Sequence, residues 1–284
     1  MITKTNTPDK QDKQPGIEAK MNPAPEYIKP NYKAAGKLQG KIALITGGDS
    51  GIGRAVSVHF AEENADIAIV YLNEDEDAEI TKKVVEARGR KCLLIKGDVK
   101  DADFCREAVE KTIMTFGRLN ILVNNAGMQF PQKEVKNITD EQLTITFKTN
   151  IFAYFYFAEA VVEHLHAGDC IINTTSVTAY RSSPALIDYS STKGAITTFT
   201  RSLATNLAEK GIRVNGVAPG PVWTPLIVSS FDEEKIKSFG SETAMKRAGQ
   251  PSELGPVYVF LASDDASFIT GQVIHVNGGE VVNG

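Results

Sequence analysis

Short apolar runs alternate with stretches of helical periodicity from about residue 41 to the end of the chain. Each run has the length of a buried strand, and the stretches between them repeat apolar residues every three to four positions. Strands are predicted at 41–46, 67–71, 92–96, 119–123, 169–175, 212–218 and 273–276. Helices are predicted near 51–63, 74–88, 101–116, 139–165, 189–209 and 252–263. This alternation predicts an α/β fold, with a doubly wound parallel sheet of seven strands and helices on both faces.

Residues 1–39 differ from the rest of the chain. They are rich in proline, lysine and asparagine and hold few apolar residues, so they cannot bury enough surface for a core of their own. We predict disorder to about residue 15. Beyond it we predict an ordered arm on the body of the protein or on a neighbouring subunit, anchored by residues such as Met21 and Tyr32. Residues 40–284 then form the single domain.

Composition and charge are those of an ordinary globular protein. The 284 residues are 42% hydrophobic and 23% charged, with a net charge of −4 that gives no reason to expect nucleic acid or an anionic membrane as a partner. Cys92, Cys105 and Cys170 are too few and too scattered for a disulfide or zinc framework, which favours a reducing cytoplasm. No apolar run reaches the roughly 18 residues of a membrane helix, and the polar N-terminus carries no secretory signal.

Tyr189 and Lys193 stand four residues apart in the helix predicted over 189–209. Residues at this spacing share one face of a helix, so the phenol and the ammonium can point into one site. A neighbouring cation stabilises a phenolate, so Lys193 is expected to lower the pKa of Tyr189 towards neutral pH. The pair is a candidate acid/base, although surface helices also carry such pairs by chance.

A glycine-rich turn, Thr-Gly-Gly-Asp-Ser-Gly-Ile-Gly over 46–53, joins the first predicted strand to the first predicted helix. In this setting glycines let the backbone approach a pyrophosphate at the helix N-terminus. The spacing T-G-x-x-x-G-x-G differs from the common G-x-G-x-x-G, and a tight turn without a ligand is the simpler alternative. The flanking strand and helix favour a dinucleotide.

Several motifs in one order make the chain resemble the short-chain dehydrogenase/reductase family. They are Thr46–Gly53, Asp98–Val99, Asn124–Gly127, Asn150, Ser176, Tyr189 with Lys193, and Pro219–Thr224. Ala153 departs from the pattern, because many members have glycine three positions after the asparagine, and this affects local packing only. The resemblance implies a Rossmann-type fold and an oxidoreductase of the glucose-dehydrogenase-like or aldehyde-reductase-like kind with an extended N-terminal arm.

The resemblance also assigns roles to four residues. Tyr189 is implied to be the acid/base, Ser176 to bind the substrate oxygen, and Lys193 to bind the nicotinamide ribose as well as to activate Tyr189. Asn150 is implied to support a water that links Lys193 to solvent. From the residues alone, Ser176 at a strand end is also a typical turn residue, and Asn150 inside a helix is typically solvent-facing or a cap.

The cofactor residues implied by the resemblance lie at strand ends, where doubly wound sheets bind ligands. Adenine is expected beside Asp98, whose alternative is a helix cap, and the carboxamide on the Val222 backbone and the Thr224 hydroxyl. The full set is Gly47, Asp49, Ser50, Gly51, Ile52, Gly53, Tyr71, Leu72, Asp98, Val99, Asn125, Ala126, Gly127, Tyr189, Lys193, Pro219, Gly220, Val222 and Thr224.

The choice between NAD and NADP depends on charge at the end of the second strand. A 2′-phosphate needs arginine or lysine there or in the glycine-rich turn, where this chain has Tyr71, Leu72 and Asp49. The acidic run 74–77 also suits a helix N-terminus, and no carboxylate ends the strand to bind the ribose diol. We predict NAD, with NADP as the alternative.

The substrate is expected under a lid formed by about 221–250. Gln129, Thr178 and Trp223 are the candidates for its pocket, and sugar, steroid, aldehyde and small ketone all remain open. No metal site is predicted, because His164 and His166 are two residues apart and do not share a helix face.

The predicted function is an NAD(P)-dependent oxidoreductase that interconverts an alcohol and a carbonyl of a small molecule by hydride transfer. The alternatives are a catalytically idle protein that senses nicotinamide dinucleotides, and an enoyl or imine reductase on the same fold. The run 151–157 is apolar or aromatic all round a helix, and the resemblance implies that it pairs with its copy in a second subunit. A second contact through 273–276 and Val281–Val282 predicts a homotetramer.

Overall fold

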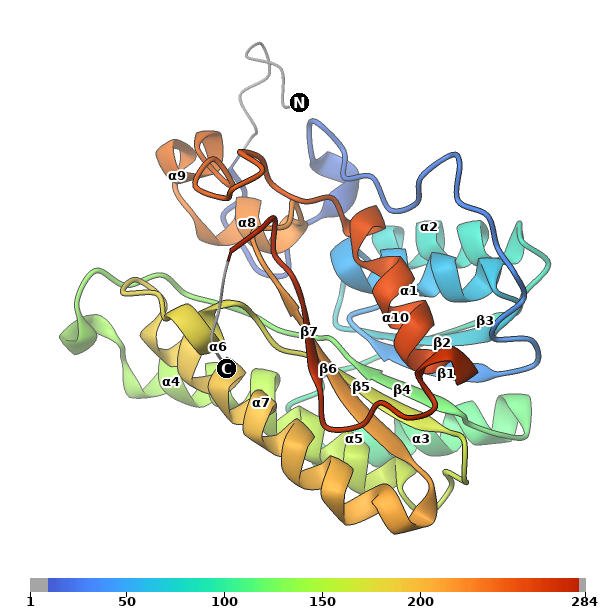
Figure 1. The fold of residues 1–284 in the computed structure, drawn as a ribbon. Coiled ribbons are helices and arrows are strands. Elements are labelled where there is room, and N and C mark those ends of the chain that lie inside the picture. Colours follow the sequence, from blue (N-terminus) through green and yellow to red (C-terminus); the bar gives the residue numbers. More distant parts are fainter. Residues whose placement is uncertain (1–9, 281–284) are drawn as a thin grey trace.

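A computed structural model describes residues 10–280 of the chain (Figure 1). Within these residues the strands form one parallel sheet of seven, in the order β3-β2-β1-β4-β5-β6-β7. They are β1 (Ile42–Thr46), β2 (Asp66–Tyr71), β3 (Cys92–Lys96), β4 (Ile121–Asn124), β5 (Cys170–Thr174), β6 (Arg213–Pro219) and β7 (Val273–Val276). The order reverses between β1 and β4, which makes the sheet doubly wound and confirms the predicted fold class.

Helices cover both faces of this sheet (Figure 1). The α-helices are α1 (Gly51–Glu62), α2 (Asp75–Glu86), α3 (Ala102–Phe116), α4 (Asp140–Phe147), α5 (Ala153–Val161), α6 (Thr178–Arg181), α7 (Ile187–Leu207), α8 (Pro225–Ser230), α9 (Glu233–Lys237) and α10 (Gly255–Ala262). Short turns of helix are η1 (Glu18–Lys20), η2 (Val135–Asn137), η3 (Lys148–Phe152), η4 (Ala208–Lys210), η5 (Pro251–Glu253) and η6 (Asp264–Ala266).

Two apolar cores hold the layers together. Side chains of α1, α2 and α10, such as Phe60 and Tyr258, pack on one face of the sheet, and those of α3, α5 and α7, such as Phe157, pack on the other. Because the central strands are covered on both sides, a strand such as β1 is buried at every position. That is why the strands stand out as continuous apolar runs in the sequence.

The helix predicted over 139–165 is broken into α4, η3 and α5 and ends at Val161. The break η3 is a π-helical turn, which is rare and often found at functional sites. It contains Asn150, whose side chain bonds the Met128 backbone N–H and carbonyl, both at 2.9 Å. The apolar periodicity continues through the break, so the sequence pattern carries no sign of it.

Residues 10–15 of the arm are docked on the body, although the prediction was disorder to about residue 15. The Gln11 N–H donates to the Val228 carbonyl at 2.8 Å. The Gln11 side chain also bonds the Ile17 N–H (2.6 Å) and carbonyl (2.9 Å), which closes a loop within the arm. Further on, Met21 is buried, as expected of an anchor. Residues 1–9 lie outside the described part of the chain.

Candidate active site

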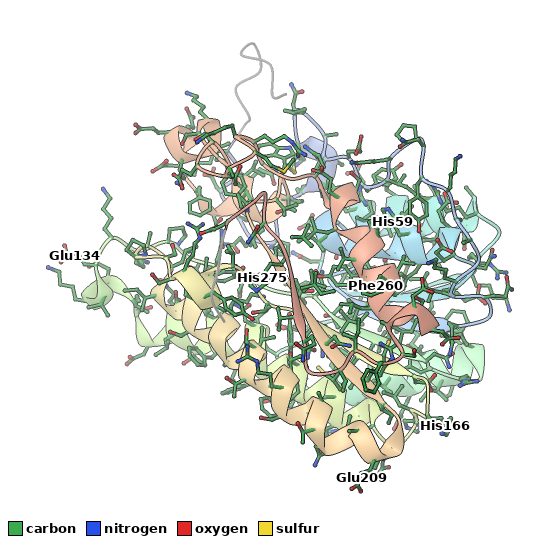
Figure 2. The ribbon with its side chains drawn as sticks, in the orientation of Figure 1. His59, Glu134, His166, Glu209, Phe260 and His275 are labelled. Carbon is green, nitrogen blue, oxygen red and sulfur yellow. The ribbon has the colours of Figure 1, made fainter. Side chains whose placement is uncertain are left out.

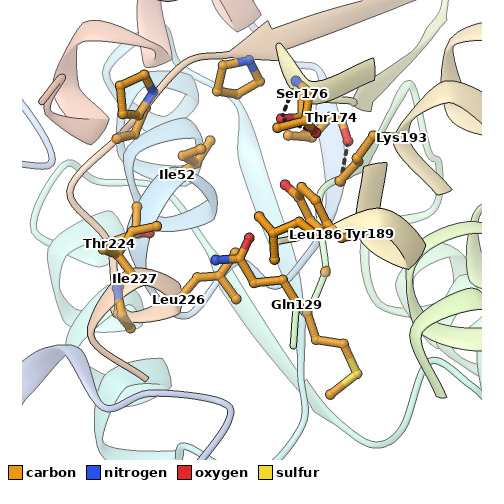
Figure 3. Close-up of a pocket in the computed structure, with 18 of the residues that line it drawn as sticks. Ile52, Gln129, Thr174, Ser176, Leu186, Tyr189, Lys193, Thr224, Leu226 and Ile227 are labelled. Carbon is orange, nitrogen blue, oxygen red and sulfur yellow. Dashed lines mark hydrogen bonds between the residues drawn. The ribbon is translucent and has the colours of Figure 1, made fainter. Parts of the chain in front are cut away.

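A cavity of about 840 Å³ lies at the carboxyl ends of the strands. Its wall includes most of the residues expected from the sequence, and Figure 3 shows a close-up of it. The expected cofactor residues in the wall are Gly47, Asp49, Ser50, Gly51, Ile52, Tyr71, Leu72, Asp98, Val99, Asn125, Ala126, Gly127, Tyr189, Lys193, Pro219, Gly220, Val222 and Thr224. Gly53, Asn150 and Trp223 are the predicted site residues that do not line it.

The glycine-rich turn is built by close backbone packing. Gly47 and Gly51 adopt positive φ angles of 62° and 52°, which favour glycine. A Cβ on Gly53 would lie 1.8 Å from the Gly47 carbonyl oxygen, so Gly53 allows helix α1 to approach the turn. The expectation that Gly53 touches the cofactor is therefore corrected: it is a packing glycine behind the wall, and Gly51 and Ile52 present the helix N-terminus to the cavity.

The end of β4 is fixed to this turn by a short network. The Thr46 hydroxyl accepts the Asn125 and Ala126 N–H groups at 2.9 and 3.0 Å, and the Asn125 amide donates to the Thr46 and Gly47 carbonyls at 3.1 and 3.2 Å.

The N-terminal cap of α3, the helix that follows β3, is Asp101, whose carboxylate accepts the Asp103 N–H at 2.9 Å. The helix-cap alternative for Asp98 is thereby excluded.

Tyr189, Lys193 and Ser176 converge on the cavity from two elements (Figure 3). The Lys193 ammonium nitrogen lies 5.4 Å from the centroid of the Tyr189 ring, one turn away on α7, and donates to the Thr174 carbonyl at 2.8 Å. Ser176 follows β5, and its hydroxyl oxygen accepts the Thr178 N–H at 3.2 Å and the Thr178 hydroxyl at 3.1 Å. These contacts aim three polar side chains at one region.

Burial shifts the two ionisable groups of the trio in opposite directions. It raises the pKa of Tyr189 to about 12, against a smaller lowering by the hydrogen bond with Ser176. It lowers the pKa of Lys193 to about 7. The expected lowering of the Tyr189 pKa by Lys193 is not found, because burial destabilises both the phenolate and the ammonium that would stabilise it.

Asn150 is fully buried beside the trio. Its amide nitrogen also donates to the Thr192 hydroxyl at 3.2 Å. A Cβ added to Gly127 would lie 3.5 Å from the Asn150 amide oxygen and 3.7 Å from the Lys193 nitrogen, so both side chains approach the same point. Asn150 is therefore neither solvent-facing nor a helix cap, and η3 brings it next to Lys193.

Gln129 and Thr178, predicted for the substrate pocket, line the cavity together with Leu226, Ile227, Phe231 and Phe239 of the predicted lid. Trp223 does not, which corrects its assignment to the substrate pocket. It is fully buried in a small core with Met21 and Ile236, and its indole N–H donates to the Pro23 carbonyl of the arm at 2.9 Å. A buried indole needs apolar volume and one acceptor, and the arm supplies the acceptor.

Sequence reasoning missed several residues of the wall. Gln14, Pro15 and Gly16 come from the arm, and Arg181 and Glu280 form an ion pair of 2.8 Å at the cavity. Neither periodicity nor a motif marks them.

Across residues 10–280, no group of three or more His, Cys, Asp or Glu could hold a metal ion. His59, His166 and His275 come from separate places: α1, the loop before β5, and β7 (Figure 2). No helix in the same range is long and apolar enough to cross a membrane.

Comparison with known sequences agrees with this geometry. Residues 47–280 match the family model described as enoyl-(acyl carrier protein) reductase. "General stress protein 39" of Bacillus subtilis (strain 168) is 59% identical over 272 residues, which are 96% of this chain and 95% of that protein. "Glucose and ribitol dehydrogenase" of Daucus carota is 52% identical over 283 residues, which are 98% of this chain and 97% of that protein.

A solved structure shows the same fold. The short-chain dehydrogenase from Burkholderia cenocepacia J2315 in complex with NADP is 32% identical, with a TM-score of 0.81, and the match covers 86% of this chain and 98% of that one. The chain belongs to the short-chain dehydrogenase/reductase family. It is thus an oxidoreductase of the kind that uses a nicotinamide dinucleotide.

Proposed function

We propose that the protein interconverts an alcohol and a carbonyl by hydride transfer, with Tyr189 as the acid/base. The observation that carries the proposal is the convergence of Tyr189, Lys193 and Ser176 on one cavity whose other end is a glycine-rich turn at a helix N-terminus. The cavity suits a dinucleotide, because Ser50, Gly51 and Ile52 at the N-terminus of α1 line it beside the glycine-rich turn, a setting that favours a pyrophosphate. Bound there, the nicotinamide donates or accepts the hydride.

The residues of the chain then handle the proton. In the reducing direction the Tyr189 hydroxyl donates its proton to the carbonyl oxygen while the Ser176 hydroxyl binds that oxygen. In the oxidising direction the Tyr189 phenolate removes the alcohol proton. In its protonated form Lys193 would favour the phenolate, against the burial that raises the pKa of Tyr189. Asn150 beside Lys193 holds the path by which the proton is exchanged with solvent.

We propose NAD as the preferred cofactor, although the solved relative binds NADP. Asp49 lines the cavity, and although burial raises its pKa to about 6, it is mostly ionised at pH 7 and would repel a 2′-phosphate. Arg54 on α1 is held by Glu18 and Asp77, so its charge is already neutralised. Lys100 at the cavity is paired with Asp98 at 3.3 Å.

The test is a screen of the purified protein against alcohols and carbonyls with NAD and NADP in parallel. Glucose and ribitol belong in the panel because the relative from Daucus carota is named for them, together with simple aldehydes, ketones and an enoyl thioester. Turnover of an alcohol, faster with NAD, supports the proposal. Binding of the cofactor without turnover of any compound favours the dinucleotide-sensing alternative, and turnover of the enoyl thioester alone favours the double-bond reductase.

The proposed assembly is a cytoplasmic homotetramer, with residues 40–284 as the catalytic domain. Phe152 and Phe155 are 43% and 51% exposed on η3 and α5, which is unusual for aromatic side chains of this size and suits burial against a second copy. The part of the predicted second contact that involves Val281 and Val282 lies outside the described residues.

A further inference from the structure

Residues 14–16 of the arm line the cavity, and the arm residues on either side of them contact the lid and the glycine-rich turn. At the lid end, Gly16 packs so closely on α8 that an added Cβ would lie 2.5 Å from the Pro225 carbonyl oxygen. At the other end, the Glu18 carboxylate accepts the Gly51 N–H at 2.5 Å. The same short segment therefore touches the elements on both the substrate and the cofactor side.

Buried charges fix the position of this segment. The Glu18 carboxylate forms an ion pair with Arg54, and the Asp77 carboxylate accepts the backbone N–H groups of Glu18 (2.6 Å) and Ala19 (3.0 Å). Glu18, Arg54 and Asp77 are each at most 4% exposed. Breaking such a pair would leave a buried charge without its partner, so the arm is held firmly beside the cavity.

Gln14 uses its side-chain amide as a clamp on the substrate side. Its nitrogen donates to the Gln129 carbonyl at 2.7 Å, and its oxygen accepts the Gln129 N–H at 3.3 Å. The Gln129 side chain in turn donates to the Ser230 hydroxyl on α8 at 2.8 Å. Gln129, which lines the substrate end, is thus held between the arm and the lid.

The arm residues of this clamp lie outside the family match, which begins at residue 47. The solved relative, matched over 98% of its own length, leaves 14% of the 284 residues of this chain, about 40, without a counterpart. The match with the relative from Daucus carota covers 98% of this chain and so includes most of the arm.

We infer, on the basis of the proposed function, that residues 14–16 of the arm form one wall of the substrate site and that Gln14 is a positioning residue. It sets the affinity for the substrate by holding Gln129 against the lid. It takes no part in hydride or proton transfer.

The test compares Gln14→Ala with the parent on the alcohol that the parent oxidises fastest. Loss of two hydrogen bonds, each of modest net strength, is expected to raise KM about tenfold, with kcat and the dissociation constant of NAD within about twofold of the parent. Gln39→Ala is the matched control, because Gln39 is exposed on the same arm and does not line the cavity. Gly16→Ala should shift the same wall through its contact with Pro225 and raise KM in the same way.

Two results would overturn the inference: an unchanged KM in Gln14→Ala, or a rise in KM accompanied by equal losses in NAD affinity and melting temperature. Either result would mean that the arm only stabilises the fold. Amide hydrogen exchange separates this result from a failure of the proposed function. If the parent oxidises no alcohol, the proposed function fails, yet faster exchange at residues 128–130 in Gln14→Ala, with the turn 47–53 unchanged, still supports the clamp. Unchanged exchange at 128–130 refutes it.

Discussion

Lys193 is a residue whose proposed role in catalysis should cost the protein stability. It is 3% exposed, and burial lowers its pKa from 10.5 to about 7. Burying an amine in this way destabilises the folded state wherever the unfolded chain would carry the proton. We therefore predict that Lys193→Met, which has similar length and no charge, is more stable than the parent and inactive.

The magnitude follows from the pKa. One pKa unit corresponds to about 1.4 kcal/mol, so the lowered pKa of Lys193 destabilises the folded state by about 4 kcal/mol at pH 7. Methionine also loses the hydrogen bond to the Thr174 carbonyl, worth about 1 kcal/mol, but that carbonyl keeps its bond from the Tyr154 hydroxyl at 3.0 Å. The expected net gain is about 3 kcal/mol at pH 7.

The stability difference between Lys193→Met and the parent should depend on pH. Because the folded pKa lies below the unfolded one, the stability associated with neutral Lys193 is fully present above about pH 10.5 and is lost as the pH falls to about 7. The advantage of Lys193→Met is therefore largest at pH 7 and below, and shrinks to about 1 kcal/mol at pH 9.

Urea unfolding of both proteins, at one chain concentration and at pH 7 and 9, measures this difference. Lys210→Met, at an exposed position on η4, is the control and should change stability little at either pH. A Lys193→Met protein no more stable than the parent at pH 7, or one whose gain is the same at both pH values, would refute the reasoning.

Two further predictions concern the cofactor and the assembly. Leu72, 40% exposed at the cavity, offers a position for a phosphate partner, so Leu72→Arg should narrow or reverse the preference for NAD over NADP. Titration of both cofactors into parent and variant checks this, and tighter binding of NADP by the parent would contradict the charge argument. Light scattering should give about four times the 30.8 kDa chain mass, and Phe155→Glu should lower it, whereas a monomeric parent at micromolar concentration would contradict the assembly.

The strands and the closeness of Tyr189 to Lys193 could be predicted because their signals are local. A strand buried on both faces is an apolar run, as in β1, and residues four apart on a helix share a face, as Tyr189 and Lys193 do. The packing role of Gly53 was beyond this reasoning, because it depends on the distance to the Gly47 carbonyl across the turn.

The arm shows the limit most clearly. Trp223 is a large aromatic residue of the kind expected in a pocket, yet its indole N–H donates to the Pro23 carbonyl, 200 residues away in sequence. Gln14 likewise meets Gln129 across 115 residues. Polar segments of this kind carry no periodicity, and their place is decided by tertiary contacts that a pattern of apolar positions does not encode. The pKa of Tyr189 is raised rather than lowered as predicted, and this was missed for the same reason, since burial depends on the whole fold.

The measurement that tests the account most directly is the rate of alcohol oxidation by Tyr189→Phe. The substitution keeps the ring and removes the hydroxyl to which we assign the proton transfer, so kcat should fall at least about 100-fold. The dissociation constant of NAD should stay within about twofold of the parent, and Tyr27→Phe, on the arm, should behave like the parent. A Tyr189→Phe protein that keeps most of its activity would contradict the assignment of Tyr189 as the acid/base.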